Sequence, residues 1–374
     1  MSEPGKIFFN NEDENSKKFT ATLNKRVNDY FKSNDISRYG NMEMYMKTVA
    51  MLSLFILPYL SLIFFEPDIF ISMILCALMG FGMAGIGLSI MHDAIHGAYS
   101  SNQSVNKFWG YTLNFVGGNA INWKIQHNVK HHSYANIHDH DEDIAPKLIL
   151  RLSPYSSIWA VHKFQHIYAW VLYGLGTFFW VTFKDFIKII NFYKEGWLQK
   201  NTSSIAKEVI ILLGSKLFYY AYIIGIPLMF TSYSGLEIFL GFLLLHVCSG
   251  LALAVIFQPS HLMEEVIYPT PDDKGKMQYS RFVHQLYTSV NFANENRFVT
   301  WYGGALNFQV EHHLYPQICH VHYPAIAKLV KQTTKEFNIP YYSKKGFWEA
   351  IREHNKMLKW LGKPESNYNL AKAV

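Results

Sequence analysis

The chain has 374 residues, of which 50% are apolar and only 17% are charged, and this balance is unusual for a soluble protein. The formal net charge of +6 does not indicate nucleic-acid binding, because the basic residues are spread along polar segments without a block. The three cysteines, Cys76, Cys248 and Cys319, lack the close spacing of a zinc or iron-sulfur site, and we expect no disulfides.

Four apolar runs predict four membrane crossings, arranged as two hairpins. The first two runs, residues 48–65 and 69–91, are long enough as helices (roughly 27 Å or more) to cross the hydrocarbon layer of a bilayer. The second hairpin is predicted at residues 209–230 and 238–257. Lys216 interrupts the third run, and we expect its long side chain to snorkel toward the cytoplasmic face.

The distribution of basic residues predicts the orientation of these crossings. Residues 1–47 are rich in lysine and arginine, whereas the turn between the first two runs is Glu66-Pro67-Asp68, so the N-terminus is expected in the cytoplasm. The apolar stretch 167–183 has lysines on both flanks and is therefore placed in the membrane interface, without crossing. The remainder, from His261 onward, is then cytoplasmic, and the sequence predicts an all-α integral membrane protein.

Seven histidines fall into three clusters, all on the predicted cytoplasmic side. They are His92 and His96, then His127, His131 and His132, and finally His312 and His313. Histidines four residues apart project from one face of a helix, which is the spacing that binds one metal ion through two imidazoles. The adjacent pair in the third cluster would point about 100° apart and serve two different ions. One such pair alone is as well explained by surface packing, but three clusters together predict a shared metal site.

Other histidines and acidic residues are weaker candidates. His261 is a further candidate ligand, because it follows the fourth crossing at the depth where the second crossing delivers His92. His246 lies within the fourth crossing, where a hydrogen bond between helices explains it best. The acidic stretch 138–143 suits a metal site or a solvated loop, and its hydrophilicity favours the loop. The remaining histidines considered lack partner spacing: His162, His166, His284, His320, His322 and His354.

The number and softness of these ligands favour iron. Some eight imidazoles exceed the four ligands of a zinc site, and no thiolates are grouped for copper(I) or an iron-sulfur cluster. Two imidazole-bound irons are therefore expected, and iron with open coordination positions activates oxygen. The membrane location then indicates oxidation of a molecule that resides in the bilayer.

With these motifs, the chain resembles the membrane fatty acid desaturases over residues 40–345. That family has boxes of the form H-x(3,4)-H, H-x(2,3)-H-H and [HQ]-x-x-H-H, which match residues 92–96, 127–132 and 309–313 here. The third box begins with Gln309 and continues into Leu314-Tyr315-Pro316, and this form resembles the front-end desaturases. Sphingolipid desaturases share the glutamine, so the substrate class stays open.

The resemblance implies four transmembrane helices under a cytoplasmic helical cap that holds two irons, and a tunnel for the acyl chain. The reaction it implies uses O2 and two electrons to introduce a cis double bond into an acyl chain carried by a membrane lipid or by CoA. The histidines of the three boxes and His261 would be iron ligands, and Gln309 a ligand or a group hydrogen-bonded to one. On this basis the chain divides into an N-terminal segment (1–47), a desaturase domain (48–345) and a C-terminal tail (346–374).

The electron source is expected to be a separate protein. Many eukaryotic front-end desaturases carry a fused haem-binding domain with a His-Pro-Gly-Gly motif, which residues 1–47 lack. A ferredoxin or similar carrier, and a location in a bacterial inner membrane, are therefore expected. Two rival functions stay open: a hydroxylase or ketolase on the same di-iron scaffold, and a metal-binding transporter or receptor without catalysis.

Overall fold

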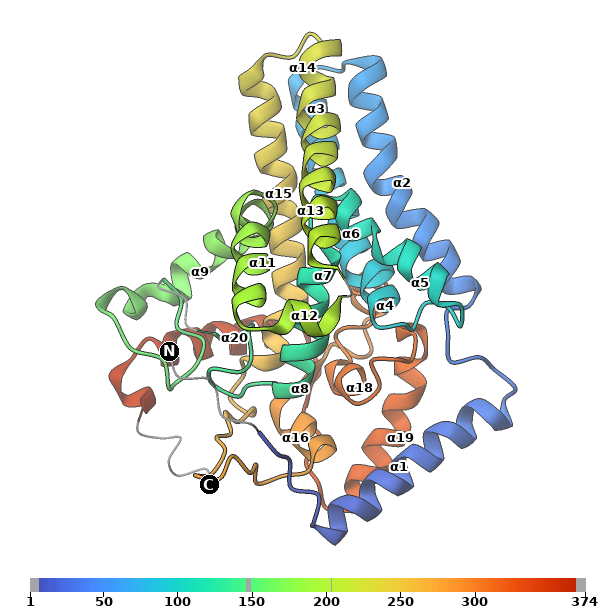
Figure 1. Ribbon diagram of the computed structural model, residues 1–374, viewed down its shortest axis with the longest axis vertical. Helices are drawn as coiled ribbons and strands as arrows, with labels where there is room; N and C mark the ends of the chain where they lie inside the picture. The colour runs from blue at the N-terminus through green and yellow to red at the C-terminus, as the bar shows by residue number, and fades with distance from the viewer. Residues whose placement is uncertain (1–6, 146–148, 203, 368–374) are drawn as a thin grey trace. The chain divides into compact units, whose positions relative to one another are not determined.

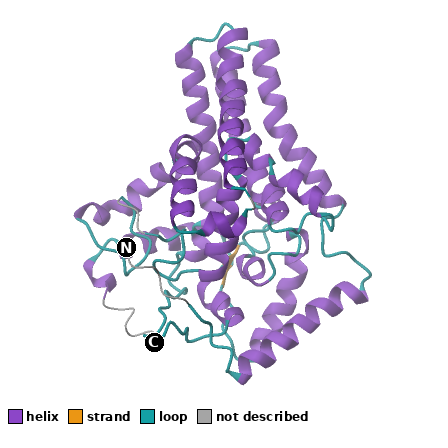
Figure 2. Ribbon diagram, viewed as in Figure 1, coloured by secondary structure: helices purple, strands orange, loops and turns teal. Residues whose placement is uncertain are grey.

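The computed structural model describes residues 7–145, 149–202 and 204–367 of the chain. Residues 1–6 of the predicted N-terminal segment and residues 368–374 of the predicted tail lie outside this part. The described chain is largely helical, and its only strands are β1 (Asn291–Phe292) and β2 (Ser343–Lys344), which pair in parallel (Figure 2). The predicted class, an all-α membrane protein, is confirmed.

The chain folds into two compact units, which we call the polar unit and the spanning unit. The polar unit consists of Met1–Tyr39, Gln126–Ala169 and Val255–Val374, and the spanning unit of Gly40–Ile125 and Trp170–Ala254. Three helices pass from one unit into the other: η2 (Lys124–His131), α9 (Gln165–Gly174) and α15 (Gly235–Phe257). Each unit therefore draws on segments that are far apart in the sequence.

The spanning unit is built on four long helical segments, the number predicted from the apolar runs. Within the described residues, four segments are long and apolar enough to cross a membrane: Met42–Phe65, Ile69–Ile95, Ile205–Phe230 and Gly235–His261. They comprise α2 (Met42–Phe65), α3 (Ile69–Gly85) with η1 (Ile86–Ile90) and α4 (Met91–Ile95), α13 (Ile205–Tyr220) with η5 (Ala221–Gly225) and α14 (Ile226–Phe230), and α15 (Figure 1).

Helix caps, and not hydropathy, decide where these segments begin. The first span starts at Met42, six residues before the apolar run, because the side chain of Asn41 accepts a hydrogen bond from the backbone N–H of Met44 (3.3 Å). Asp68 caps α3 in the same way, through Phe70 and Ile71. The predicted spans were therefore correct in number and too short at their polar ends.

The remaining helices of the spanning unit are short. They are α5 (Gln103–Gly110), α6 (Thr112–Phe115), α7 (Ala120–Trp123), α10 (Gly176–Phe179), η4 (Trp180–Lys184), α11 (Asp185–Lys194) and α12 (Trp197–Asn201). The stretch 167–183, which we predict to lie in the interface, is divided among α9, α10 and η4, with an interruption at Leu175. It is absent from the candidate spans found in the described residues.

Lys216 corrects one expectation. It does not snorkel: its side chain is buried, and its Nζ donates hydrogen bonds to Oδ2 of Asp185 (2.7 Å) and to the carbonyl of Gly117 (2.5 Å). The ion pair with Asp185 of α11 compensates the positive charge of Lys216 inside the protein, so the ammonium group is stabilised without contact with water. The expectation for His246 is confirmed, because its Nε2 accepts a hydrogen bond from the hydroxyl of Tyr219 on α13 (3.0 Å).

The polar unit packs around an amphipathic N-terminal helix, α1 (Glu14–Ser33). Its buried residues recur every four positions, at Phe19, Leu23, Val27 and Phe31, and share a core with α19 (Tyr323–Glu336). The other elements are α8 (His132–Tyr134), η3 (Ala160–Phe164), η6 (Pro259–His261), α16 (Arg281–Thr288), α17 (Arg297–Tyr302), α18 (Gln309–Leu314), η7 (His320–His322), α20 (Phe347–Leu361) and η8 (Pro364–Asn367).

Candidate metal centre

Three histidines from three separate segments of the polar unit converge on one point. His131 ends η2, His261 ends η6, and His313 lies in α18. Their ligand nitrogens all lie within 4.8 Å of one another, and all three side chains are buried. The Nε2 atoms of His261 and His313 are 3.1 Å apart. Such spacing is typical of imidazoles that share one metal ion.

Hydrogen bonds on the far side of the rings orient two of these histidines. Nδ1 of His261 lies 2.8 Å from the backbone carbonyl of Thr288, which only accepts, so the ring proton sits on Nδ1. Nδ1 of His131 lies 3.0 Å from Oδ1 of Asp141, and the same reasoning applies. Each ring therefore directs its Nε2 toward the point of convergence, as metal-binding histidines do, and His131 offers a lone pair there once its Nε2 proton is lost.

Gln285 orients the third ring, that of His313. The Nε2 group of Gln285 donates to the backbone carbonyl of His132 (3.1 Å), so its Oε1 faces Nδ1 of His313 at 2.8 Å and accepts that proton. Nε2 of His261 and Nε2 of His313 thus face each other with a lone pair on each. Two lone pairs at this distance repel unless a cation lies between them, so the donor set fits a metal ion.

Nearby carboxylates favour the protonated form of one ring in the cluster, that of His131. Burial lowers the pKa of His131, but the charges of Asp141 and Asp143 outweigh burial and raise it to about 9. Since a ligand must be deprotonated, metal binding at this cluster has to displace a proton from His131.

A second cluster in the polar unit combines His127, His132 and His312. Nε2 of His132 lies 3.2 Å from Nε2 of His127 and 2.9 Å from Nε2 of His312. The hydroxyl of Tyr323 points toward the carbonyl of Tyr315 (3.4 Å) and lies 3.3 Å from Nδ1 of His312. The adjacent residues His312 and His313 therefore face different clusters, as their angular offset on a helix requires.

Local helix geometry explains how the second box supplies both clusters. Residues 124–131 form a π-helix, in which hydrogen bonds run from residue i to i+5, so His127 and His132 come side by side. In an α-helix, residues five apart would point roughly 140° away from each other. π-Turns of this kind occur preferentially at functional sites. The sequence pattern anticipated the pairing of residues four apart, and this pairing of residues five apart is additional.

The first box belongs to the spanning unit, where His92 and His96 lie together. Helical geometry continues through them, since the backbone N–H of His96 donates to the carbonyl of His92 (3.1 Å). Their ring centroids are 4.8 Å apart, and both rings pack edge-on against Trp123. A π-turn, η1, immediately precedes them on the same helical segment. The predicted pairing of these two rings on one helix face is present in the structure.

Gln309 lies beside the first cluster of the polar unit. Its amide nitrogen is 3.0 Å from Nε2 of His261, and its Oε1 is buried without a hydrogen-bond partner among the described residues. The two ends of an amide differ only in their hydrogen-bonding role. A half-turn of this amide places Oε1 where the nitrogen now lies, facing the same point as the histidines. Gln309 therefore fits the cluster as an oxygen donor.

A buried carboxylate holds the helix of the third box, and nothing in the sequence pattern indicated this role. Glu311 accepts hydrogen bonds from Nδ2 of Asn291 (2.7 Å) and from the hydroxyl of Tyr341 (3.0 Å). Oδ1 of the same asparagine accepts from the backbone N–H of Val310 (2.9 Å). Burial raises the pKa of Glu311 to about 7. These bonds tie α18 to β1 and to the segment before β2.

The acidic stretch 138–143 is a loop, as the sequence favoured, and Asp139 is exposed, but one of its residues requires a correction. Asp141 is only 1% exposed, and it accepts hydrogen bonds from His131 and from the backbone N–H of Asn136 (2.8 Å). The carboxylate is stabilised where it lies by these donors, so burial does not leave it unpaired. Asp141 therefore orients the ring of His131 from the side of the ring that faces away from the cluster. Thr288, Gln285 and Tyr323, which also orient ligand rings, were missed because no local motif marks them.

Two of the excluded histidines have structural roles. His284 lies on α16, and its Nε2 is 2.9 Å from the carbonyl of Ala135; burial lowers its pKa to about 4. His354 lies on α20, with Nδ1 3.2 Å from the carbonyl of Leu262, and burial again lowers its pKa to about 4. Both rings tie helices to backbone segments, as ordinary buried histidines do.

Comparison with known proteins identifies the family of the chain. Residues 69–345 match the family model named fatty acid desaturase. The chain is 33% identical over 347 residues to the sn-1 linoleoyl-lipid 6-desaturase of Synechocystis, with 92% of this chain and 96% of that protein covered. It is 33% identical to the acyl-lipid (8-3)-desaturase of Physcomitrium patens (94% and 73% covered) and 30% identical to that of Mortierella alpina (92% and 78% covered). The chain therefore belongs to the fatty acid desaturase family and is an oxidoreductase of lipid metabolism.

Proposed function

We propose that the chain is an O2-dependent di-iron desaturase of the front-end type, acting on an acyl chain of a membrane lipid. The observation that carries the proposal is the convergence of His131, His261 and His313, whose ring protons are all held on the far side. Two irons, when bound, supply the oxygen activation that removes two vicinal hydrogens from the acyl chain. The chain's own residues hold the donors in place and keep water away.

The proposed ligands of the first iron are His131, His261 and His313, with Gln309 as a further donor. Asp141, Thr288 and Gln285 hold the Nδ1 protons, so each Nε2 is available without rotation of its ring. The side chains of these ligands are at most 6% exposed. A dry donor set strengthens each charge interaction and excludes competing reactions with water.

The proposed ligands of the second iron are His127, His132 and His312, completed by His92 and His96 of the first box. The spacing, the shared helix face and the burial of His92 support the role of that box. Replacement of His92 by alanine is expected to lower the iron content from about two per chain to about one, without loss of membrane insertion. An unchanged iron content would contradict its role as a ligand.

The names of the relatives favour an acyl-lipid substrate over acyl-CoA, and a new double bond on the carboxyl side of an existing one. Lipids from cells that express the chain and are fed linoleic acid should gain a double bond between the carboxyl end and the existing ones. Accumulation of a hydroxy acid without a new alkene would instead establish the hydroxylase. A new alkene confined to the long-chain base of sphingolipids would establish the sphingolipid desaturase.

The orientation and the electron source complete the proposal. The basic residues of the N-terminal segment support a cytoplasmic N-terminus and metal centre. The relative from Synechocystis favours a bacterial inner membrane. A separate electron carrier, such as a ferredoxin, is the proposed donor. Purified protein should turn over with a soluble reduced carrier, and turnover that needs no added carrier would contradict this part of the proposal.

A further inference from the structure

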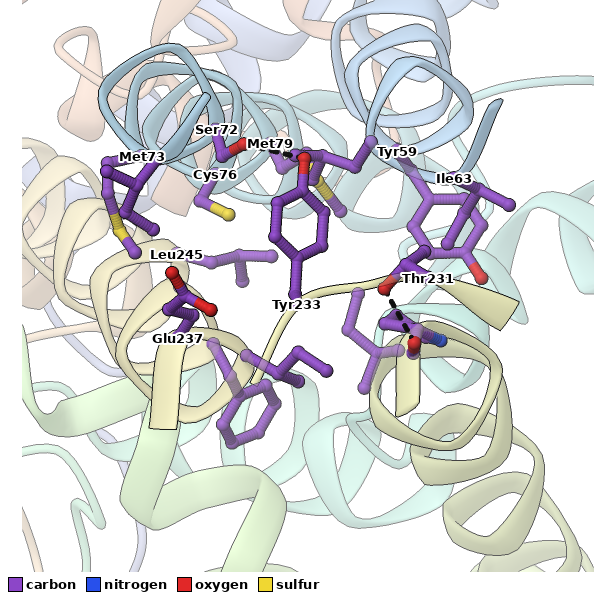
Figure 3. Close-up of a pocket in the computed structure, with 17 residues that line it drawn as sticks. Tyr59, Ile63, Ser72, Met73, Cys76, Met79, Thr231, Tyr233, Glu237 and Leu245 are labelled. Carbon is purple, nitrogen blue, oxygen red and sulfur yellow. Dashed lines mark hydrogen bonds between the residues drawn. The ribbon is translucent and has the colours of Figure 1, made fainter. Parts of the chain in front are cut away.

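The spanning unit contains a cavity that has no part in the histidine clusters (Figure 3). It encloses about 550 Å³, its open mouth included, and all of its lining comes from the four spanning segments and the turn at residues 231–234. The lining is mainly apolar, and Met73, Cys76 and Met79 contribute three sulfur-containing side chains from α3. Flexible, polarisable side chains of this kind adapt to an irregular hydrocarbon ligand.

Backbone contacts between helices close this cavity toward the first histidine box. A Cβ atom on Gly80 would lie 2.4 Å from the carbonyl oxygen of Leu245, and one on Gly82 would lie 2.6 Å from the backbone nitrogen of Phe55. At these two glycines α3 therefore touches both α15 and α2, immediately below Met79. His92 follows Met79 by thirteen residues on the same helical segment, roughly 20 Å along it. The cavity is thus a site separate from the metal ligands.

The side of the cavity between α2 and η5 is closed as well. The hydroxyl of Tyr59 donates to the carbonyl of Tyr222 (2.7 Å), and the two rings pack edge to face with centroids 5.7 Å apart. At the opposite end, the hydroxyl of Tyr233 bonds to the carbonyl of Pro67 and to the hydroxyl of Ser72, both at 2.8 Å. Figure 3 shows the Tyr233 ring in the middle of the lining, with its hydroxyl turned to Ser72. These hydroxyl groups already hydrogen-bond to other groups of the protein, so the cavity would recognise a bound ligand by its apolar surface.

The charge at this end of the helices is negative. Glu66 and Asp68 lie in the turn between α2 and α3, and Glu237 lies in the first turn of α15 and lines the cavity. The sequence contains no lysine or arginine in residues 48–106 or 217–273, which include all of the cavity lining. An anionic headgroup at the mouth would be repelled by the carboxylates, and no lysine or arginine is among the residues that line the cavity.

We propose that this cavity binds one hydrocarbon chain of a membrane lipid whose headgroup carries no net negative charge. The cavity lies within apolar spanning helices, where lipid is the surrounding solvent, and its lining is mainly apolar. The headgroup lies at the mouth, near Glu237 and the Tyr233 hydroxyl, and its chain extends toward Met79. This lipid is distinct from the substrate, because the helix contacts at Gly80 and Gly82 separate the cavity from the end of the second spanning segment that carries His92.

Photo-crosslinking of the full chain in lipid vesicles tests the proposal. The protein is reconstituted in phosphatidylcholine that contains a trace of phosphatidylcholine with a diazirine on its acyl chain, and adducts are mapped by mass spectrometry. Adducts are expected on the deep lining residues Met79 and Leu245. The same acyl chain on phosphatidylglycerol should give a marked loss of these adducts. Adducts confined to lipid-facing positions such as Ile74 would overturn the proposal, and equal labelling from both lipids would overturn its charge requirement.

A matched pair of variants separates the cavity from general lipid contact. Met73→Trp fills the cavity from α3, whereas Ile74→Trp adds the same side chain to the exposed neighbouring position. The first should abolish the adducts on Met79 and Leu245, and the second should leave them unchanged. Retention of these adducts in a folded Met73→Trp protein would refute binding in the cavity. The comparison of the two lipids on the unaltered protein stays decisive if that variant does not fold.

Discussion

Replacement of Gln285 by leucine should weaken metal binding without removing any of the proposed ligands. Gln285 accepts the Nδ1 proton of His313 at 2.8 Å and donates to the carbonyl of His132 at 3.1 Å, so it fixes the tautomer and the orientation of one ring. Loss of such a partner typically costs about 10- to 100-fold in metal affinity, or about 1.4–2.8 kcal/mol. The buried N–H of His313 also loses its acceptor, which costs about 1–3 kcal/mol of stability.

Anaerobic titration of the purified protein with Fe(II), followed by metal analysis, measures this effect. The expected result is a dissociation constant about 10- to 100-fold higher for the iron nearest His313. Gln285→Glu keeps an oxygen acceptor for that ring and should recover part of the affinity. Gln332→Leu, on the exposed face of α19, is the control and should bind iron normally. A folded Gln285→Leu protein with wild-type affinity would refute the reasoning.

Three further predictions concern activity, pH and the membrane unit. His313→Ala should abolish desaturation while membrane insertion stays intact, and retained turnover would refute its role as a ligand. Burial lowers the pKa of His354 to about 4 from an ordinary 6.5, so its stabilising effect is complete above pH 6.5 and is lost as the pH falls toward 4. The loss amounts to about 3 kcal/mol, and thermal unfolding of His354→Gln should show a correspondingly weaker dependence on pH in this range. Lys216→Met leaves Asp185 buried without its cation and should cost about 3–5 kcal/mol, whereas the added change Asp185→Asn should restore much of the stability in a detergent denaturation assay.

The fold class and the number of spanning helices followed from composition, because a helix that crosses a bilayer needs about twenty apolar residues. Their ends did not follow, because side-chain caps such as Asn41 start a helix before its apolar run begins. The prediction that the Lys216 side chain snorkels toward the cytoplasmic face was also wrong. Its partner, Asp185, is 31 residues away in the sequence, and no local pattern marks the pair.

The histidine pattern determined by itself which side chains could bind metal, since ligand type and spacing are local properties of a helix. Only the tertiary structure decided how the rings of the polar unit divide into two clusters. That division depends on the π-turn at residues 124–131 and on the two faces of α18. The groups that orient the rings, among them Gln285, Thr288 and Asp141, also came only from the structure. They lie on other segments, and a hydrogen bond between distant segments leaves no periodic trace in the chain.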